Sequence, residues 1–190
     1  MADAGRIIAG TARGIRLEAP GAATRPLADR VKQTLFAILE PDLPGAQVLD
    51  LFAGSGAAGL EALSRGAAHV TFIERDADAT AVIARNLAKT GLGGERVAIV
   101  RSEVVGWLRS RAAPNVGPID IAIVDPPYAE TELLRAALEA TEPLLAPDVR
   151  VVAKHFWRDA PPARIGLLAS ERERRFGETA LTFYRRVEEG

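Results

Sequence analysis

The chain has 190 residues, of which 48% are hydrophobic, and its formal net charge is −1 at pH 7. This length suits one domain with a small appendage and leaves no room for a second large domain. The absence of cysteine excludes disulfides, thiolate metal sites and a cysteine nucleophile, and the presence of only two histidines argues against a histidine metal site. Because the amino end lacks a long apolar segment, we expect a cytoplasmic protein with no signal peptide or membrane span.

Charge is distributed unevenly along the chain. Residues 1–35 carry six basic and three acidic side chains, residues 36–149 carry nine and sixteen, and residues 150–190 carry nine and six. An acidic centre between two basic ends suits a polyanionic substrate. A solvated surface explains the same imbalance equally well.

The first 44 residues are predicted to form a small appendage. Arginines alternate with apolar side chains over residues 6–9 and 14–18, which is typical of two short strands. We expect these strands to form a hairpin with a basic face, after a few mobile residues at the amino end. From Pro26, apolar side chains recur at helical spacing until two prolines, Pro41 and Pro44, end the helix. The core is expected over residues 45–190.

The core begins with a glycine-rich turn. An apolar run over residues 48–52 is followed by Gly54, Gly56 and Gly59, which fit the G-x-G-x-x-G spacing, and then by a run of helix formers that ends near Gly66. Such glycines permit a tight turn, let a ligand approach the backbone and allow close packing of helix on strand. A strand-to-helix turn without any ligand remains an alternative interpretation of this pattern.

Acidic residues near the ends of three predicted strands favour a ligand-binding role for the glycine-rich turn. Asp50 lies inside the apolar strand and therefore needs a donor or a ligand, while Glu74 ends the strand 69–74 and suits hydrogen bonds from ribose hydroxyls. Glu103 follows the strand 97–101, where it could contact adenine or begin a helix. These acids predict a cofactor that contains adenosine. A dinucleotide and S-adenosylmethionine both qualify.

Strands and helices alternate through the core, which predicts an α/β fold with a mostly parallel sheet covered on both faces. Asp76 and Gly91 are expected to begin and end one helix, and residues 130–141 form another. Lys154 and His155 follow the strand 149–153, and we expect both to lie on the surface rather than against a substrate. Residues 163–168 and 179–187 alternate around the charged segment 172–177, which predicts a closing antiparallel hairpin.

The segment Asp125-Pro126-Pro127-Tyr128 is the most specific motif of the chain. It follows the apolar strand 119–124, so Asp125 is delivered to the same edge of the sheet as the other acids. Two prolines remove two amide donors and leave carbonyls that only accept. Acceptors that hold the hydrogens of an aromatic amino group favour the pyramidal geometry needed to attack a methyl sulfonium, and Tyr128 can stack on a base. A proline-rich turn with an aspartate cap is the alternative without function.

Together these motifs resemble the class I S-adenosylmethionine-dependent methyltransferases, and specifically the RsmD family of bacterial small-subunit (16S) ribosomal RNA guanine-N2 methyltransferases. The resemblance spans nearly the whole chain and rests on residues 6–10, 13–14, 25–26, 29–31, 35–36, 50–56, 59–66 and 125–128. It implies a Rossmann-like, seven-stranded sheet whose last hairpin is antiparallel. It also implies S-adenosylmethionine as the cofactor and a guanine in an assembling or assembled 30S subunit as the substrate.

The candidate site residues follow from the motifs and the resemblance. The candidate catalytic residues are Asp125, Pro126, Pro127 and Tyr128. The candidate cofactor-binding residues are Asp50, Phe52, Gly54, Ser55, Gly56, Glu74, Arg75 and Glu103. The candidate RNA-binding residues, all in the appendage, are Arg6, Arg13, Arg25 and Arg30.

The chain departs from the family pattern at a few positions. Leu27 stands where threonine is usual, Ala37 where asparagine is common, and Lys154 where an acid often ends the fifth strand of the core. Tyr128 replaces a frequent phenylalanine. These changes concern local RNA contacts rather than the class of reaction.

Three other functions share part of the pattern. A DNA adenine-N6 methyltransferase uses the same Asp-Pro-Pro-Tyr chemistry but normally needs a sizeable recognition region, for which this chain has no room. An NAD-dependent oxidoreductase would use the glycine turn but gives no reason for the proline motif. A non-catalytic adenosine-binding module would not need a complete set of acceptors. Measuring whether S-adenosylmethionine or NAD raises the melting temperature of the protein would distinguish these classes.

Overall fold

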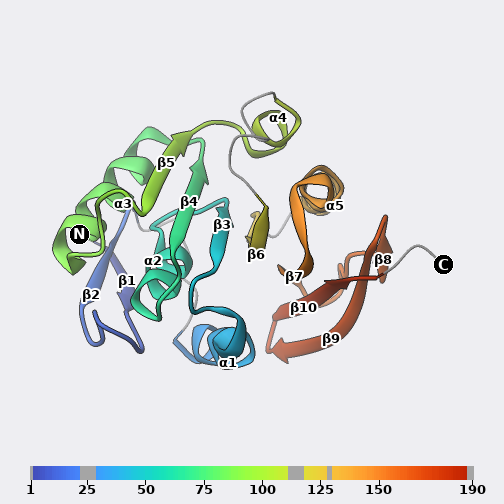
Figure 1. Cartoon of the computed structure of the whole chain (residues 1–190), viewed down its shortest axis with the longest axis horizontal. Helices are drawn as coiled ribbons and strands as arrows, with labels where there is room; N and C mark the ends of the chain where they lie inside the picture. The colour runs from blue at the N-terminus through green and yellow to red at the C-terminus, as the bar shows by residue number, and fades with distance from the viewer. Residues whose placement is uncertain (1, 22–28, 111–117, 128–129, 188–190) are drawn as a thin grey trace.

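A twisted eight-stranded sheet forms the centre of the molecule (Figure 1). The computed structural model describes residues 2–21, 29–110, 118–127 and 130–187. The strand order across the sheet is β5-β4-β3-β6-β7-β10-β9-β8. The strands are β3 (Gln47–Leu51), β4 (His69–Glu74), β5 (Val97–Arg101), β6 (Ile119–Val124), β7 (Leu145–Phe156), β8 (Arg164–Ile165), β9 (Leu168–Phe176) and β10 (Thr179–Arg186).

The first five of these strands in chain order are parallel, and the last three add to β7 in antiparallel fashion. The predicted α/β sheet with an antiparallel carboxyl-terminal hairpin is therefore confirmed. The strand order reverses between β3 and β6. In open sheets of this kind, ligands bind at the carboxyl ends of the strands beside such a reversal.

The carboxyl-terminal strands differ from the prediction in two respects. The sheet has eight strands instead of seven because Arg164–Ile165 forms a two-residue edge strand, β8. The charged segment 172–176 is not a turn but the second half of β9, and the chain reverses at Gly177. Most side chains of β9 are exposed, so the strand is held mainly by backbone pairing with β10. For the same reason, its sequence shows no alternation of apolar and polar residues that would predict a strand.

Helices cover both faces of the sheet. On one face lie α1 (Asp29–Leu39), α2 (Ala57–Ser64) and α3 (Ala77–Thr90), and on the other lie α4 (Val104–Arg109) and α5 (Thr131–Thr141). Short 3₁₀ turns at Glu40–Asp42 and Glu142–Leu144 follow α1 and α5. The predicted caps of α3 are confirmed, since the Asp76 carboxylate accepts from Ala79 N and Gly91 ends the helix with a φ of 69°. No helix in the described ranges is long and apolar enough to span a membrane.

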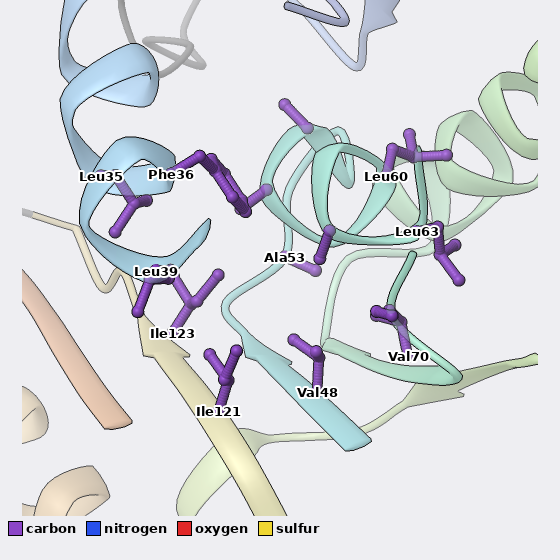
Figure 2. Close-up of a cluster of buried hydrophobic side chains, with 14 of the residues drawn as sticks. Leu35, Phe36, Leu39, Val48, Ala53, Leu60, Leu63, Val70, Ile121 and Ile123 are labelled. Atoms are coloured by element: carbon purple, nitrogen blue, oxygen red, sulfur yellow. The ribbon is translucent and has the colours of Figure 1, made fainter. Parts of the chain in front are cut away.

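The core beneath α1 and α2 is shown in Figure 2. Leu39 of α1 lies beside Ile121 and Ile123 of β6, Phe36 of α1 points toward α2, and Leu63 of α2 lies near Val70 of β4. The apolar residues on the buried face of each helix recur at the helical period, whereas successive residues of each strand point to opposite faces of the sheet. A second apolar cluster on the opposite face joins α4 and α5 to the other side chains of the same strands.

The amino-terminal hairpin packs directly on this core. It pairs β1 (Ala2–Arg6) with β2 (Arg16–Ala19), so the expectation of mobile residues at positions 2–5 is wrong. The hairpin docks on α2 because Glu61 accepts hydrogen bonds from Ile8 N (2.8 Å) and Ala9 N (3.0 Å). Ser64 adds bonds to the adjoining loop, including one from Ala12 N to its Oγ (3.0 Å).

Lys32 belongs to the same buried contact. Its side chain is fully buried, with Nζ 3.7 Å from Glu61 Oε2 and donating to the carbonyl of Arg6. Burial lowers the pKa of Lys32 from its usual value, and the charge of Glu61 opposes that shift. Lys32 therefore contributes to docking of the hairpin and presents no charge to solvent. It is one of the six basic side chains of residues 1–35, but it does not add to the basic surface of this segment.

We expect Gly59→Ala to destabilise the protein by about 1–3 kcal/mol, the usual cost of overpacking a core. A Cβ at this position of α2 would lie 2.3 Å from Phe72 Cε1 and 2.8 Å from Val70 Cγ1, so helix and strand would have to separate. Gly93→Ala is the matched control, because its Cβ would meet only Leu87 Cβ, at 4.0 Å. Urea unfolding of both variants measures the difference. Equal stabilities would show that α2 does not depend on this close approach.

Candidate functional site

A cavity of about 710 Å³ opens at the carboxyl ends of β3, β4, β6 and β7. Every described candidate catalytic or cofactor-binding residue except Gly56 lines it. The lining residues are Pro20, Gly21, Asp50, Phe52, Ala53, Gly54, Ser55, Ala57, Ala58, Glu74, Arg75, Asp76, Asp78, Ala79, Glu103, Val104, Asp125, Pro126, Pro127, Glu130, Leu133 and Lys154. The strand-order reversal thus brings together residues that are far apart in the sequence.

Asp50 ties the end of β3 to the first turn of α2. Its carboxylate is 2% exposed and accepts a hydrogen bond from Gly59 N at 2.9 Å. The pKa of Asp50 is raised to about 8, mainly by burial, with smaller contributions from the charges of Asp125 and Glu74, while the Gly59 amide acts in the opposite direction. The Gly59 amide is therefore the hydrogen-bond donor that we expected for an acid inside an apolar strand.

The glycine-rich loop between β3 and α2 is held by Glu74. Gly54 N donates to Glu74 Oε2 (2.8 Å), and Asp76 N donates to Oε1 (2.9 Å). The loop turns through three residues with positive φ, Phe52 at 63°, Gly54 at 55° and Gly56 at 75°. Each carboxylate oxygen of Glu74 keeps a further lone pair, so the loop contacts do not exhaust its capacity to accept.

Gly56 does not line the cavity, and its position matters for the structure of the loop instead. It begins α2 with a φ of 75°, and a Cβ there would lie 3.2 Å from Ile83 and 3.3 Å from Phe72. Its conformation and its lack of a side chain therefore serve the turn and the packing of α2.

Glu103 begins a helix, as one of its two interpretations predicted, and also lines the cavity. Its carboxylate caps α4, accepting from Val105 N (3.0 Å) and Gly106 N (2.6 Å). Arg75, Phe52 and Ser55 line the same wall.

Asp125 lies beside a lysine that the sequence interpretation placed on the surface. Lys154 Nζ is 2.6 Å from Asp125 Oδ1 and 2.8 Å from Oδ2, and its side chain is only 11% exposed. The surface expectation is wrong for His155 as well, since that ring is buried and its Nε2 lies 2.8 Å from Thr182 Oγ1. The register that pairs Val124 with Ala153 makes Asp125 and Lys154 neighbours, and this register was not readable from either strand alone.

The two prolines differ in what their carbonyls do. Pro127 O accepts from Glu130 N at 3.1 Å, whereas Pro126 O accepts no hydrogen bond within the described part of the chain. Pro126 is buried and Pro127 is exposed at the mouth of the cavity. Tyr128, the last residue of the motif, lies outside the described residues.

The described candidate RNA-binding arginines, Arg6, Arg13 and Arg30, do not line the cavity. Arg6 pairs with Asp29, with Nε 3.4 Å from Oδ2, while Arg13 and Arg30 are exposed. Arg25 lies outside the described residues.

Sequence reasoning gave no signal for Asn86, a fully buried residue in the middle of α3. Its Nδ2 donates to Ser55 O and to Glu18 O, both at 3.0 Å, and its Oδ1 accepts from Glu18 N at 2.9 Å. Asn86 therefore joins the glycine-rich loop to β2 of the hairpin. A polar residue on the buried side of a predicted helix is the only sequence feature that could have indicated it.

The lining of the cavity is strongly acidic. Seven of its residues carry carboxyl groups and only Arg75 and Lys154 are basic. The seven are Asp50, Glu74, Asp76, Asp78, Glu103, Asp125 and Glu130. Such a site favours a ligand with positive charge and repels phosphate groups.

Comparison with known proteins places this site in a family. Residues 5–185 match the family model described as conserved hypothetical protein 95. The chain is 37% identical over 192 residues to ribosomal RNA small subunit methyltransferase D of Escherichia coli K12, covering 97% of this chain and 91% of that protein. It is 35% identical over 184 residues to YlbH of Bacillus subtilis, named as a candidate rRNA methyltransferase, covering 95% and 98%. The structure of yhhF from Escherichia coli, described as a candidate methyltransferase, has a TM-score of 0.80 at 37% identity and covers 95% and 97%.

The raised pKa of Asp50 predicts a pH-dependent stability. Between its ordinary value of 3.8 and its native value of about 8, the folded state holds a proton that the unfolded state has released. The stability contributed by that proton is present at low pH and is lost as the pH rises towards 8. Relative to Asp50→Asn, the free energy of unfolding of the wild type should therefore fall from pH 5 to pH 8.

Urea unfolding at four pH values in this range measures the effect. Asp148→Asn, which removes an exposed carboxylate that does not line the cavity, controls for the loss of one charge. Parallel curves for the wild type and Asp50→Asn would contradict protonation of the buried carboxyl group.

Proposed function

The chain belongs to the conserved hypothetical protein 95 family, which is the RsmD family that its motifs resemble, and we propose that it methylates the N2 amino group of a guanine in 16S ribosomal RNA with S-adenosylmethionine as methyl donor. The observation that carries this proposal is that Asp125 and Pro126 line an acidic cavity whose wall includes Glu74. The names of the Escherichia coli and Bacillus subtilis relatives, which specify rRNA methylation, support it.

The residues present fit S-adenosylmethionine. A volume of about 710 Å³ is in the range of small-molecule sites, and the acidic lining complements a ligand with a sulfonium and an ammonium group. Glu74 has lone pairs left for ribose hydroxyls, and Gly54 lets a ligand approach the backbone closely. When bound, S-adenosylmethionine would supply a methyl group on positively charged sulfur.

The acceptors at the mouth of the cavity account for the choice of an amino group. The lone pair of an exocyclic amine is delocalised into the purine, so the nitrogen is a poor nucleophile until its hydrogens are held out of the ring plane. Asp125 and the free carbonyl of Pro126 would accept those two hydrogens. After attack, the nitrogen is positively charged and releases one proton to water or to a neighbouring group.

Lys154 adds a constraint that the family pattern lacks. Its ammonium contacts both oxygens of Asp125 and so holds the carboxylate in one orientation. Each oxygen retains a lone pair for the substrate amine. We infer that Lys154 positions Asp125 and that the amine binds beside this ion pair.

The RNA would reach the mouth of the cavity over the appendage, residues 1–44, which we propose as an RNA-binding segment. Arg13 and Arg30 are exposed and form no ion pair with any described residue, so they can meet phosphates. In the sequence, Arg13 precedes and Arg25 and Arg30 follow the segment 20–21, which lines the cavity. Ribosomal RNA in an assembling or assembled 30S subunit, in the cytoplasm, is the substrate that this arrangement fits.

Glu74→Gln should weaken S-adenosylmethionine binding by about tenfold or more, because a charge-assisted hydrogen bond contributes about 1.5–3 kcal/mol. Calorimetric titration measures the affinity. Glu95→Gln, an exposed change outside the cavity, is the matched control and should bind as the wild type does. Unchanged affinity in a folded Glu74→Gln variant would remove this residue from the site.

The reaction is tested by incubating the protein with labelled S-adenosylmethionine and small subunits that lack the modification, followed by nucleoside analysis. We expect label in N2-methylguanosine. Asp125→Ala, which removes this acceptor, should lower kcat by about two to three orders of magnitude, the usual cost of one preorganised transition-state contact, while cofactor affinity stays within about twofold. Label in N6-methyladenosine, or wild-type turnover by the variant, would contradict the proposal.

A further inference from the structure

We propose that Trp157, Arg158 and Arg175 form a second phosphate-binding surface for the RNA, beside the mouth of the cavity. This group is called the Trp157 cluster. The inference rests on the proposed function, because it assigns a further contact to the same substrate. It places RNA binding on the carboxyl-terminal strands as well as on the amino-terminal appendage.

Both arginines of the cluster are held against one indole ring. The guanidinium carbon of Arg175 lies 3.5 Å from the ring centre of Trp157, and that of Arg158 lies 4.8 Å from it. Cation–π contact restrains both side chains in place, and a restrained guanidinium loses less freedom when it binds phosphate. The cluster is thus organised before RNA arrives.

Backbone contacts fix the cluster at the turn between β9 and β10. Trp157 N donates to Glu178 O at 3.0 Å, and Arg175 Nε donates to Gly177 O at 2.9 Å. No described residue bonds to the terminal nitrogens of Arg175. That fork is therefore available for the two-point hydrogen bonding that arginine makes with phosphate.

The topology places the cluster at the same edge of the sheet as the cavity. Because β6 and β7 are parallel and Val124 pairs with Ala153, Asp125 and Lys154 leave the sheet side by side. Trp157 follows Lys154 by three residues, roughly 10 Å along the strand direction. Nucleotides next to a base held at Asp125 would lie within reach of the cluster.

Charge compensation on the rest of the surface favours this location. Three of the six basic side chains that precede residue 36 are already paired with carboxylates: Arg6 with Asp29, Arg16 with Asp3, and Lys32 with Glu61. By contrast, Arg158 and Arg175 are exposed and pair with no carboxylate of the described residues, although Asp159 and Glu178 are close in sequence. The same holds for Arg172 and Arg174 on β9. Uncompensated cations are those that release counterions on binding phosphate.

The test compares the double variant Arg158→Gln/Arg175→Gln with Lys89→Gln/Arg96→Gln, a control that removes two exposed, unpaired charges near the opposite edge of the sheet. A labelled single-stranded RNA oligonucleotide is titrated over a range of salt concentrations. With about 0.7 units of slope per phosphate contact, the double variant should lose about 1.4 units from the salt dependence of its affinity, and the control should lose none. Arg158→Glu, a single change at an exposed side chain, should weaken binding in the same direction.

Methylation of small subunits supplies the second readout. The KM for subunits should rise about tenfold in the double variant, while kcat at saturating subunits and the affinity for S-adenosylmethionine stay unchanged. An unchanged oligonucleotide affinity and salt slope in a folded double variant would overturn the assignment. Weaker binding to subunits alone would also overturn it, since it would indicate contact with a ribosomal protein. A wild type that methylates no RNA would refute the proposed function, yet the oligonucleotide titration would still decide this inference.

Discussion

Carboxylates at the carboxyl ends of two neighbouring strands hold the functional site in shape. Asp50 binds the amide of Gly59 and Glu74 binds the amide of Gly54, so the loop between β3 and α2 is anchored at both ends. An acid buried at a strand end is costly without a donor, and glycine amides can approach it because no side chain intervenes. The cavity wall therefore depends on hydrogen bonds that stabilise the fold and shape the site at the same time.

The amino-terminal hairpin depends on that arrangement in turn. Glu61 lies on α2, the helix that begins at the glycine-rich loop, and it accepts the amides that dock the hairpin. On the other side of the loop, Asn86 bonds both Ser55 O and Glu18. The glycine-rich loop and the proposed RNA-binding appendage are thus connected by two sets of buried polar contacts.

Local sequence patterns predicted most of what positions the site. The strand 69–74, the caps of α3 and the acids at the strand ends were predictable because each follows from periodicity, capping chemistry or the cost of a buried charge. Contacts that depend on register were not predictable. Lys154 meets Asp125 only through the pairing of β6 with β7, and Lys32 is buried only because Glu61 lies opposite it. The exposed strand β9 leaves no apolar pattern at all.

The acidic cavity suits a cationic adenosine ligand and disfavours a dinucleotide with a pyrophosphate. Calorimetric titration of the folded protein with S-adenosylmethionine and, in parallel, with NAD tests it most directly. The acidic lining of the cavity predicts one S-adenosylmethionine bound per chain and no heat of binding for NAD. Saturable binding of NAD, or no binding of S-adenosylmethionine, would contradict the account.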